Sequence, residues 1–235
     1  MLYKINKIEE NLDYISKNLK GENIIVELTG TPKSGKTTCV QAIRKTFEKE
    51  GIPFEIRRET AEYNPISKTS KDYNTWMVME LFKNTIEDIE GQGKIIIYDR
   101  GIWDRKFWLE HSRQNEKMGM TDIKLLNSLY DLSVVKDYDP VLLAFKTSPE
   151  LSIKRKGKVS THINMESLSS YNKIFDAGQE GLKNASKTYS YFETDEYQGK
   201  IKEFIVDVTE ELTNNIVRVL EEREKPDKEG KEVEY

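Results

Sequence analysis

Glycines, a lysine and hydroxyl residues stand at a fixed spacing near the start of the chain. The run fits the pattern G-x-x-x-x-G-K-[ST] and reads Gly30-Thr31-Pro32-Lys33-Ser34-Gly35-Lys36-Thr37, followed by Thr38. Glycines let the backbone curl so that its N–H groups face phosphate oxygens, and a helix N-terminus adds partial positive charge. In such a loop the lysine reaches the β- and γ-phosphates, and the last hydroxyl binds Mg²⁺. We therefore expect residues 30–38 to bind a nucleoside triphosphate through Lys36 and Thr37.

An acidic and a basic residue follow a short apolar run at Tyr98-Asp99-Arg100-Gly101. The carboxyl ends of parallel strands meet at the ligand crevice, so we expect Asp99 beside the phosphate loop. There it would hold Mg²⁺ through water or orient Thr37. Arg100 would neutralise a phosphoryl group in transfer or bind a substrate phosphate. The alternative is an Asp99–Arg100 pair that only organises the loop.

A carboxylate follows a second apolar run, at Arg57-Arg58-Glu59. Glu59 would act as a general base toward an attacking hydroxyl, or would hold that hydroxyl by a hydrogen bond. The alternative is a surface ion pair with Arg57 or Arg58. Glu62 is a weaker choice for the same function.

The run Lys154-Arg155-Lys156-Gly157-Lys158 is basic, and we expect residues 154–164 to form a loop. A mobile basic loop that closes over a triphosphate would neutralise charge and exclude water, and Arg155 is the first choice within it. The alternative is a solvated turn. The other candidate residues give weaker functional signals. Trp103, Phe107 and Trp108 either stack on a base or pack in the core. His111 and His162 lack metal-ligand spacing, and Cys39 is expected to be buried.

Alternating apolar runs and amphipathic stretches supply the elements that position these residues. Short apolar runs at 24–28, 54–57, 95–98, 141–145 and 204–208 predict five strands, and helical spacing predicts helices over 2–19, 36–50, 72–90, 103–117 and 122–136, with Thr121 as an N-cap. Further helices are expected to open at Ser148-Pro149-Glu150, to include Met165 to Ile174, and to include Leu212 to Val219. The alternation predicts a three-layer α/β fold with a five-stranded parallel sheet covered on both faces.

Composition and charge narrow the class of protein. The chain has 235 residues with 37 basic and 41 acidic side chains, so nucleic acid is an unlikely partner. A single cysteine and the absence of an apolar run of membrane-spanning length favour a cytoplasmic protein without a membrane partner. We expect an amphipathic helix in residues 1–21, one domain in 22–222, and a disordered charged tail in 223–235. The helix either covers the domain or contacts a second subunit.

These motifs resemble the P-loop kinases of the thymidylate kinase and deoxynucleoside kinase group over about residues 23–222. The resemblance rests on GTPKSGKTT (30–38), RRETAE (57–62), YDRG (98–101) and TSPELSIKRKG (147–157). It implies a P-loop NTPase fold, ATP as donor, Mg²⁺, a small-molecule phosphate acceptor, Glu59 as the base and, often, a homodimer. The chain departs from the group at Gly101, where a bulky or hydroxyl residue is usual, at Thr60, where proline is common, in its arginine-poor lid and in its first 20 residues.

The sequence thus favours an ATP-dependent kinase for a nucleoside, nucleotide or similar small acceptor. Lys36, Asp99, Arg100 and Arg155 would stabilise the transferring charge, and Glu59 would position or deprotonate the acceptor. Two alternatives stay open: a nucleotide-binding ATPase or switch without a small acceptor, and a polynucleotide-end kinase. A GTPase is disfavoured because the chain has no Asn-Lys-x-Asp run for guanine.

Overall fold

The computed structural model describes residues 1–115, 118–156 and 164–225. Five strands form one sheet in the order β2-β3-β1-β4-β5, and every neighbouring pair is parallel. The strands are β1 (Ile24–Gly30), β2 (Phe54–Arg57), β3 (Ile95–Asp99), β4 (Val141–Lys146) and β5 (Tyr189–Glu193). The predicted five-stranded parallel sheet is confirmed.

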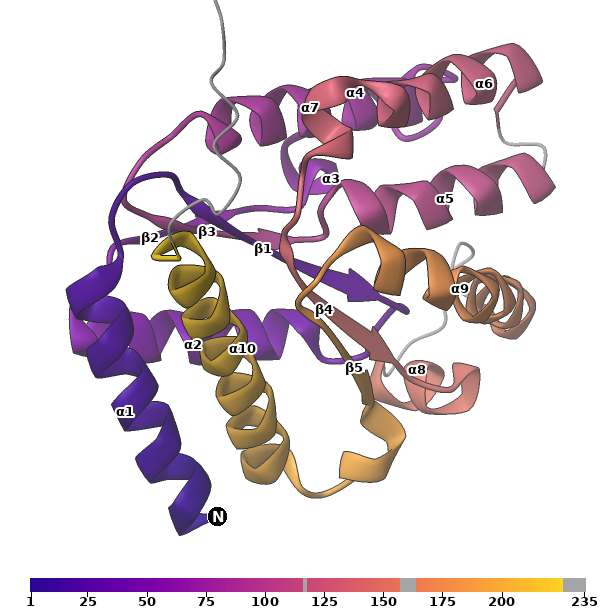
Figure 1. Cartoon of the computed structure of the whole chain (residues 1–235). Helices are drawn as coiled ribbons and strands as arrows, with labels where there is room; N and C mark the ends of the chain where they lie inside the picture. The colour runs from indigo at the N-terminus through magenta and orange to yellow at the C-terminus, as the bar shows by residue number, and fades with distance from the viewer. Residues whose placement is uncertain (116–117, 157–163, 226–235) are drawn as a thin grey trace, which may run out of the picture.

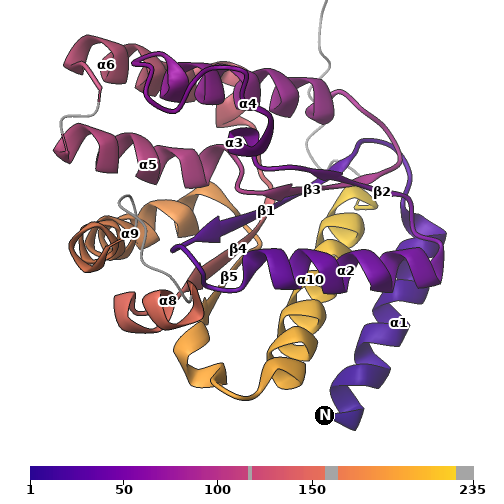
Figure 2. The same cartoon turned by 180° about the vertical axis from the view of Figure 1, so that it is seen from behind.

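Helices cover both faces of this sheet, as Figures 1 and 2 show from opposite sides. One face packs against α2 (Lys36–Glu50) and α10 (Ile201–Arg223), and the opposite face packs against α4 (Tyr73–Ile89), α5 (Ile102–Gln114) and α9 (Met165–Ala185). Strand β1 sits in the middle and is buried along its whole length. The sheet therefore separates two apolar cores, which fixes its strand ends as a rigid frame.

Shorter elements connect this frame. They are α3 (Thr60–Tyr63), α6 (Met120–Ser128), the 3₁₀ turn η1 (Leu129–Asp131), α7 (Ser133–Lys136), α8 (Pro149–Lys156) and the 3₁₀ turn η2 (Thr194–Tyr197). The single helix predicted over 122–136 is wrong, because the chain turns into an extended conformation at Leu132 before α7. Thr121 is also not a cap, since α6 begins one residue earlier, after Gly119.

The fifth strand lies elsewhere than the sequence predicted. Residues 204–208 belong to α10, and β5 comes from the tyrosine-rich segment 189–193. A short β-branched run does not distinguish a strand from a buried helix segment. Here Phe204 and Val208 continue every fourth residue into the buried stripe of the long helix α10. Because this helical spacing of buried residues continues through α10, the segment 204–208 is helical and not a strand.

The N-terminal helix α1 (Leu2–Asn18) packs alongside α10. Leu12 and Ile15 are buried in the same core as β1 and α2. Lys4 forms ion pairs with Asp207 and Glu210 at 2.9 and 3.0 Å, and Asn11 donates a hydrogen bond to Asn214 at 2.7 Å. Of the two alternatives for this helix, covering the domain is therefore the one that the structure shows. No helix among the described residues is long and apolar enough to cross a membrane.

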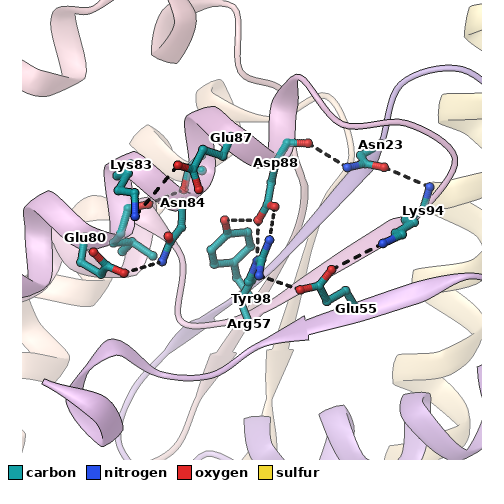
Figure 3. A network of polar contacts seen from close by, with 12 residues as sticks. Asn23, Glu55, Arg57, Glu80, Lys83, Asn84, Glu87, Asp88, Lys94 and Tyr98 are labelled. Atoms are coloured by element: carbon teal, nitrogen blue, oxygen red, sulfur yellow. Dashed lines mark hydrogen bonds and ion pairs between the residues drawn. The ribbon is translucent and has the colours of Figure 1, made fainter.

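A polar network fastens the end of β2 to α4 (Figure 3). Asp88, buried in the last turn of α4, accepts hydrogen bonds from the Arg57 guanidinium and from the Tyr98 hydroxyl, the latter at 2.6 Å. Arg57 also pairs with Glu55 at 2.6 Å. A carboxylate at a helix C-terminus is unfavourable by itself, so these donors are what keeps Asp88 in place. The network fixes the backbone two residues before Glu59.

Candidate active site

A cavity of about 970 Å³ opens at the carboxyl end of the sheet. Its lining includes all five residues predicted to be catalytic, which are Lys36, Glu59, Asp99, Arg100 and Arg155. The phosphate-loop residues Pro32, Lys33, Ser34, Gly35, Thr37 and Thr38 line it as well, whereas Gly30 and Thr31 do not. Segments far apart in the sequence thus converge on one cavity, as expected for the carboxyl edge of a parallel sheet.

The phosphate loop is shaped by close packing against β4. Gly30 has φ +139°, and a Cβ at this position would overlap the backbone of Phe145. The next residue, Thr31, donates its N–H to the Phe145 carbonyl at 2.9 Å. Only glycine combines this positive φ with the absence of a Cβ that position 30 requires. The turn therefore leads into residues 32–35, which line the cavity just before α2.

Lys36 is held by the loop that it follows. Its ammonium donates to the carbonyl oxygens of Gly30 and Thr31 at 2.9 Å each and to Ser34 Oγ at 3.2 Å. Burial and the charge of Arg100 together lower the pKa of Lys36 to about 7, although Asp104, Asp99 and Glu59 oppose this shift. Phosphate oxygens in the cavity would favour the charged ammonium. The site therefore holds a cation ready for a polyanion.

Thr37 and Asp99 form the pair that the sequence suggested for a metal. Thr37 Oγ1 donates to Asp99 Oδ2 at 2.9 Å. A hydroxyl and a carboxylate oxygen fit Mg²⁺, which prefers oxygen ligands and keeps waters and substrate phosphates in its coordination sphere. The part of the chain that the structure describes holds no cluster of three or more His, Cys, Asp or Glu side chains suited to a metal. The remaining ligands would then come from phosphates and water.

Arg100 sits in a strained backbone conformation, with φ +77°. Such a conformation in a non-glycine residue costs about 1–3 kcal/mol. Its guanidinium donates to both oxygens of Asp104, at 2.8 and 3.1 Å, and pairs with Glu59 Oε1 at 3.3 Å. Burial opposes its charge, yet Asp104 and Glu59 raise the pKa of Arg100 above its usual range. The backbone conformation and the two carboxylates together hold the Arg100 guanidinium in the wall of the cavity.

Glu59 stands directly before α3, as its N-cap residue. Its ionic partner is Arg100 rather than a neighbour in sequence, because Arg57 is held by Asp88 and Glu55. About 35% of its side chain stays exposed, and it lines the cavity. Glu59 is thus a carboxylate beside a cation at the place where a hydroxyl would approach. Glu62, the weaker choice, is exposed and does not line the cavity.

Asp104 is an organising residue that the sequence analysis missed. It is fully buried and accepts hydrogen bonds from Gly30 N at 3.0 Å and from Thr29 Oγ1 at 3.2 Å, besides the bonds from Arg100. Burial alone would raise the pKa of this carboxyl, but Arg100, Lys36 and the hydrogen bonds outweigh it and hold the pKa below its ordinary value. Its place four residues after Arg100 is a signal that could have found it.

Glu27 explains the unusual glycine after Arg100. This buried carboxyl group accepts from the N–H groups of Ile102 and Trp103, at 3.0 and 3.2 Å, and from the Tyr138 hydroxyl at 2.8 Å. A Cβ on Gly101 would overlap the Glu27 carboxyl group. Burial raises the pKa of Glu27 to about 7. Nothing in the sequence marks one glutamate within a strand, because its partners lie 75 to 111 residues away.

Arg155 lies on the helix α8, so the prediction of a loop is wrong for residues 154–156, while 157–163 lie outside the described residues. Leu151 N donates to Ser148 Oγ at 3.3 Å, which confirms the predicted start of this helix. Arg155 donates to the Lys33 carbonyl at 3.0 Å and to the Thr194 carbonyl and hydroxyl at 3.2 Å each. It therefore bridges the phosphate loop to η2.

The aromatic residues divide between core and cavity. Phe107 is buried against Phe175. Trp108 lines the cavity, and the Arg100 guanidinium lies 5.8 Å from its ring centroid. Cys39 is buried, as expected. His111 is buried with its ring against Trp108 and Tyr171, and His162 lies outside the described residues.

Comparison with known proteins gives structural but not sequence matches. No protein-family model and no curated protein matches the chain. Two structures of deoxyadenosine kinase from M. mycoides, one with the products dCMP and a flexible dCDP and one with dCTP, match with a TM-score of 0.59 and 19% identity, over 83% of this chain and 100% of theirs. A structure of that kinase with dATP matches with a TM-score of 0.57 and 18% identity, over 73% and 91%. The chain therefore shares the α/β fold of these proteins.

Proposed function

We propose that this protein is an ATP-dependent kinase that transfers the γ-phosphoryl group to a nucleoside, a nucleotide or a similar small molecule. The observation that carries the proposal is the shared cavity, in which a phosphate loop faces a carboxylate–guanidinium pair, Glu59 and Arg100. A switch protein needs the first of these but not the second. The likeness in fold to kinases whose structures contain nucleotides supports the same function.

We assign the residues that line the cavity to two ends by their chemistry. The donor end consists of the phosphate loop (30–38), Asp99, Arg155 and the segment 194–201. The residues of this segment that line the cavity are Thr194, Tyr197, Gln198, Gly199 and Ile201. The acceptor end consists of Glu59, Arg100 and Trp108. ATP would lie along the donor end, with its phosphates on the loop and its base beside Arg155 and residues 194–201. The acceptor would lie against Glu59 and Trp108.

Each polar residue then has a defined task. Lys36, Arg100 and Arg155 stabilise the charge that spreads over the phosphoryl oxygens during transfer. Glu59 accepts a proton from the attacking hydroxyl, or orients the acceptor by a hydrogen bond. Thr37 and Asp99 would hold Mg²⁺, which supplies charge neutralisation at the β- and γ-phosphates. Asp104 keeps Arg100 and the phosphate loop in register through its bonds to both.

The test is a screen of ATP consumption across nucleosides, nucleoside monophosphates and other small metabolites, each with Mg²⁺. We expect ADP to form only with particular acceptors, in a stoichiometric ratio to the phosphorylated product. ADP formation at the same rate with no acceptor would replace the kinase by an ATPase. Turnover only with oligonucleotide ends would replace the small acceptor by a polynucleotide.

A further inference from the structure

Three buried hydrogen-bond donors on α5 and α9 have no partner in the part of the chain that the structure describes. Within the described residues, Arg105 Nε, Trp103 Nε1 and the Tyr171 hydroxyl are buried and lack a hydrogen-bond partner. Buried polar groups in proteins are paired in the great majority of cases, and leaving one unpaired is costly. The two nitrogens can only donate, and the hydroxyl has a hydrogen to donate. This group of atoms therefore lacks acceptors.

Arg105 also lacks a counter-charge. It is only 6% exposed, and its hydrogen bond to Thr60 Oγ1 is long, at 3.4 Å. None of the ion pairs among the described residues includes it, whereas Arg100 on the same segment is shared by Glu59 and Asp104. A buried cation is stable only when it is paired with an anion. The unpaired guanidinium therefore marks a place for an anion.

Arg105 and Tyr171 do not line the cavity themselves, but both contact residues that line its acceptor end or adjoin them in sequence. Thr60, its hydrogen-bond partner, follows Glu59 directly, and the pKa of Tyr73 responds to the charges of both Glu59 and Arg105. The ring of Tyr171 packs on Trp108 with centroids 4.7 Å apart. Burial and the charge of Asp104 raise the pKa of Tyr171, whereas the charges of Arg100 and Arg105 and the approach of the Arg100 guanidinium to the hydroxyl oxygen lower it. Because Arg100 can only donate, the hydroxyl hydrogen still has no acceptor among the described residues. Thr60, the partner of Arg105, thus adjoins Glu59 in the acceptor end, and Trp108, the partner of Tyr171, belongs to that end.

From this arrangement we infer that Arg105 binds an oxyanion of the acceptor substrate, with the Tyr171 hydroxyl as a further donor. The inference rests on the proposed function and specifies its acceptor as an anionic small molecule. The guanidinium presents two parallel N–H donors, which match the two oxygens of a phosphate monoester or a carboxylate. A neutral carbonyl would satisfy Nε but would leave the charge uncompensated. A nucleoside monophosphate and a carboxylate-bearing nucleoside both carry the required oxyanion.

Isothermal calorimetry on matched ligand pairs tests the inference, with a non-hydrolysable ATP analogue and Mg²⁺ present. One pair is deoxyadenosine and its 5′-monophosphate, a second is deoxycytidine and its 5′-monophosphate, and a third is uridine and its 6-carboxylate, orotidine. We expect the anionic member of at least one pair to bind about tenfold or more tightly than the neutral member, since each tenfold step is the effect of one good charged contact. The pair that shows the preference identifies the oxyanion as phosphate or carboxylate.

Variants then assign the preference to Arg105. Arg105→Met should reduce it to about threefold or less, and Arg105→Lys should leave an intermediate value, because the charge stays and the paired donors are lost. The matched control is Arg113→Met on the same helix, since Arg113 is exposed and pairs with Glu110 at 2.6 Å. It should leave the preference unchanged. Unaltered binding of the ATP analogue shows that each variant is folded, and Arg105→Lys carries the test if Arg105→Met does not fold.

Two results would overturn the inference: equal binding of both members of every pair, or a full preference in the folded Arg105 variants. Either could occur in a working kinase, so the failure of the inference is distinct from that of the proposed function. Conversely, an Arg105-dependent preference in a protein that transfers no phosphoryl group would contradict the kinase and leave the anion site standing.

Discussion

The donor end and the acceptor end of the cavity differ in how their polar groups are satisfied. At the donor end, Lys36, Thr37 and Arg155 all have partners within the chain. Beside the acceptor end, Arg105 Nε and the Tyr171 hydroxyl are buried without partners. A loop that binds phosphates with its own backbone can be complete before the ligand arrives, whereas a recognition site leaves donors for the substrate to satisfy. This difference supports the proposal that an acceptor supplies the partners that are missing beside its end.

The largest expected effect comes from the donor end. Lys36→Ala should lower kcat by about 10³-fold or more, because it removes a buried cation that stabilises the transferring charge. The far-ultraviolet spectrum should stay unchanged, and steady-state kinetics with saturating acceptor measures the loss. A control is Lys45→Ala on the exposed side of α2, which should keep full activity. Normal turnover in the Lys36 variant would remove this lysine from the mechanism.

The next effect separates the two ends. Glu59→Gln should reduce kcat by about 10²–10⁴-fold, the range for loss of a general base, while leaving the affinity for ATP within about twofold. Binding of an ATP analogue and turnover are measured on the same preparation. Glu62→Gln is the matched control, since Glu62 lies outside the cavity lining. If ATP binding fell as far as turnover did, Glu59 would belong to the donor end and the division would be wrong.

A smaller effect should be confined to the donor end. Arg155→Met should raise the KM for ATP about tenfold, which corresponds to about 1.4 kcal/mol, and leave the KM for the acceptor unchanged. The physical reason is the loss of a cation that joins the phosphate loop to Thr194. Arg44→Met serves as control, because Arg44 is exposed and pairs only along its own helix with Glu48 at 2.8 Å. A rise in the acceptor KM instead would place Arg155 at the other end.

Between the ends lies Glu27, which should give the smallest effect, on stability rather than rate. Its pKa is raised to about 7 in the folded protein from an ordinary 4.5, so protonation favours folding. This contribution is complete below about pH 4.5 and is lost as the pH rises through 7. From pH 5.5 to 8, the free energy of unfolding of the wild type should therefore fall by about 1–2 kcal/mol more than that of Glu27→Gln.

Urea denaturation at both pH values measures this difference. Glu9→Gln, at an exposed position of α1, is the control and should keep the pH dependence of the wild type. Parallel curves for the wild type and Glu27→Gln would show that Glu27 is ionised in the folded protein throughout this range.

The sequence predicted the strands that lead into the phosphate-loop motif and into Asp99 because their signals are local. A motif of eight consecutive residues defines the phosphate loop, and strands β1 and β3 are short apolar runs that end at Gly30 and Asp99. The five-stranded parallel sheet followed from the same alternation. The fifth strand did not, since residues 204–208 have strand-like composition but continue the buried stripe of α10. Tertiary burial, and not local propensity, decides such a run.

The acceptor end was predicted only in part because its contacts are distant. Glu59 and Arg100 stood out as polar residues after strands, but their pairing across 41 positions did not. Asp104, Arg105 and Glu27 carry no motif, and their roles depend on burial and on partners that the fold brings together. The four-residue separation of Arg100, just before α5, from Asp104 in its first turn was the single local signal. The contacts proposed to recognise the acceptor therefore could not be predicted from the sequence.

We propose that the γ-phosphoryl group passes from ATP at the donor end to a small molecule at the acceptor end. The most direct test of this transfer is to incubate the wild type with γ-³²P-labelled ATP, Mg²⁺ and the acceptor that the screen identifies, and to separate the products. The account predicts that the label appears in the acceptor in equal amount to the ADP formed, and that Lys36→Ala transfers none. Label released only as inorganic phosphate, at a rate that the acceptor does not change, would contradict it.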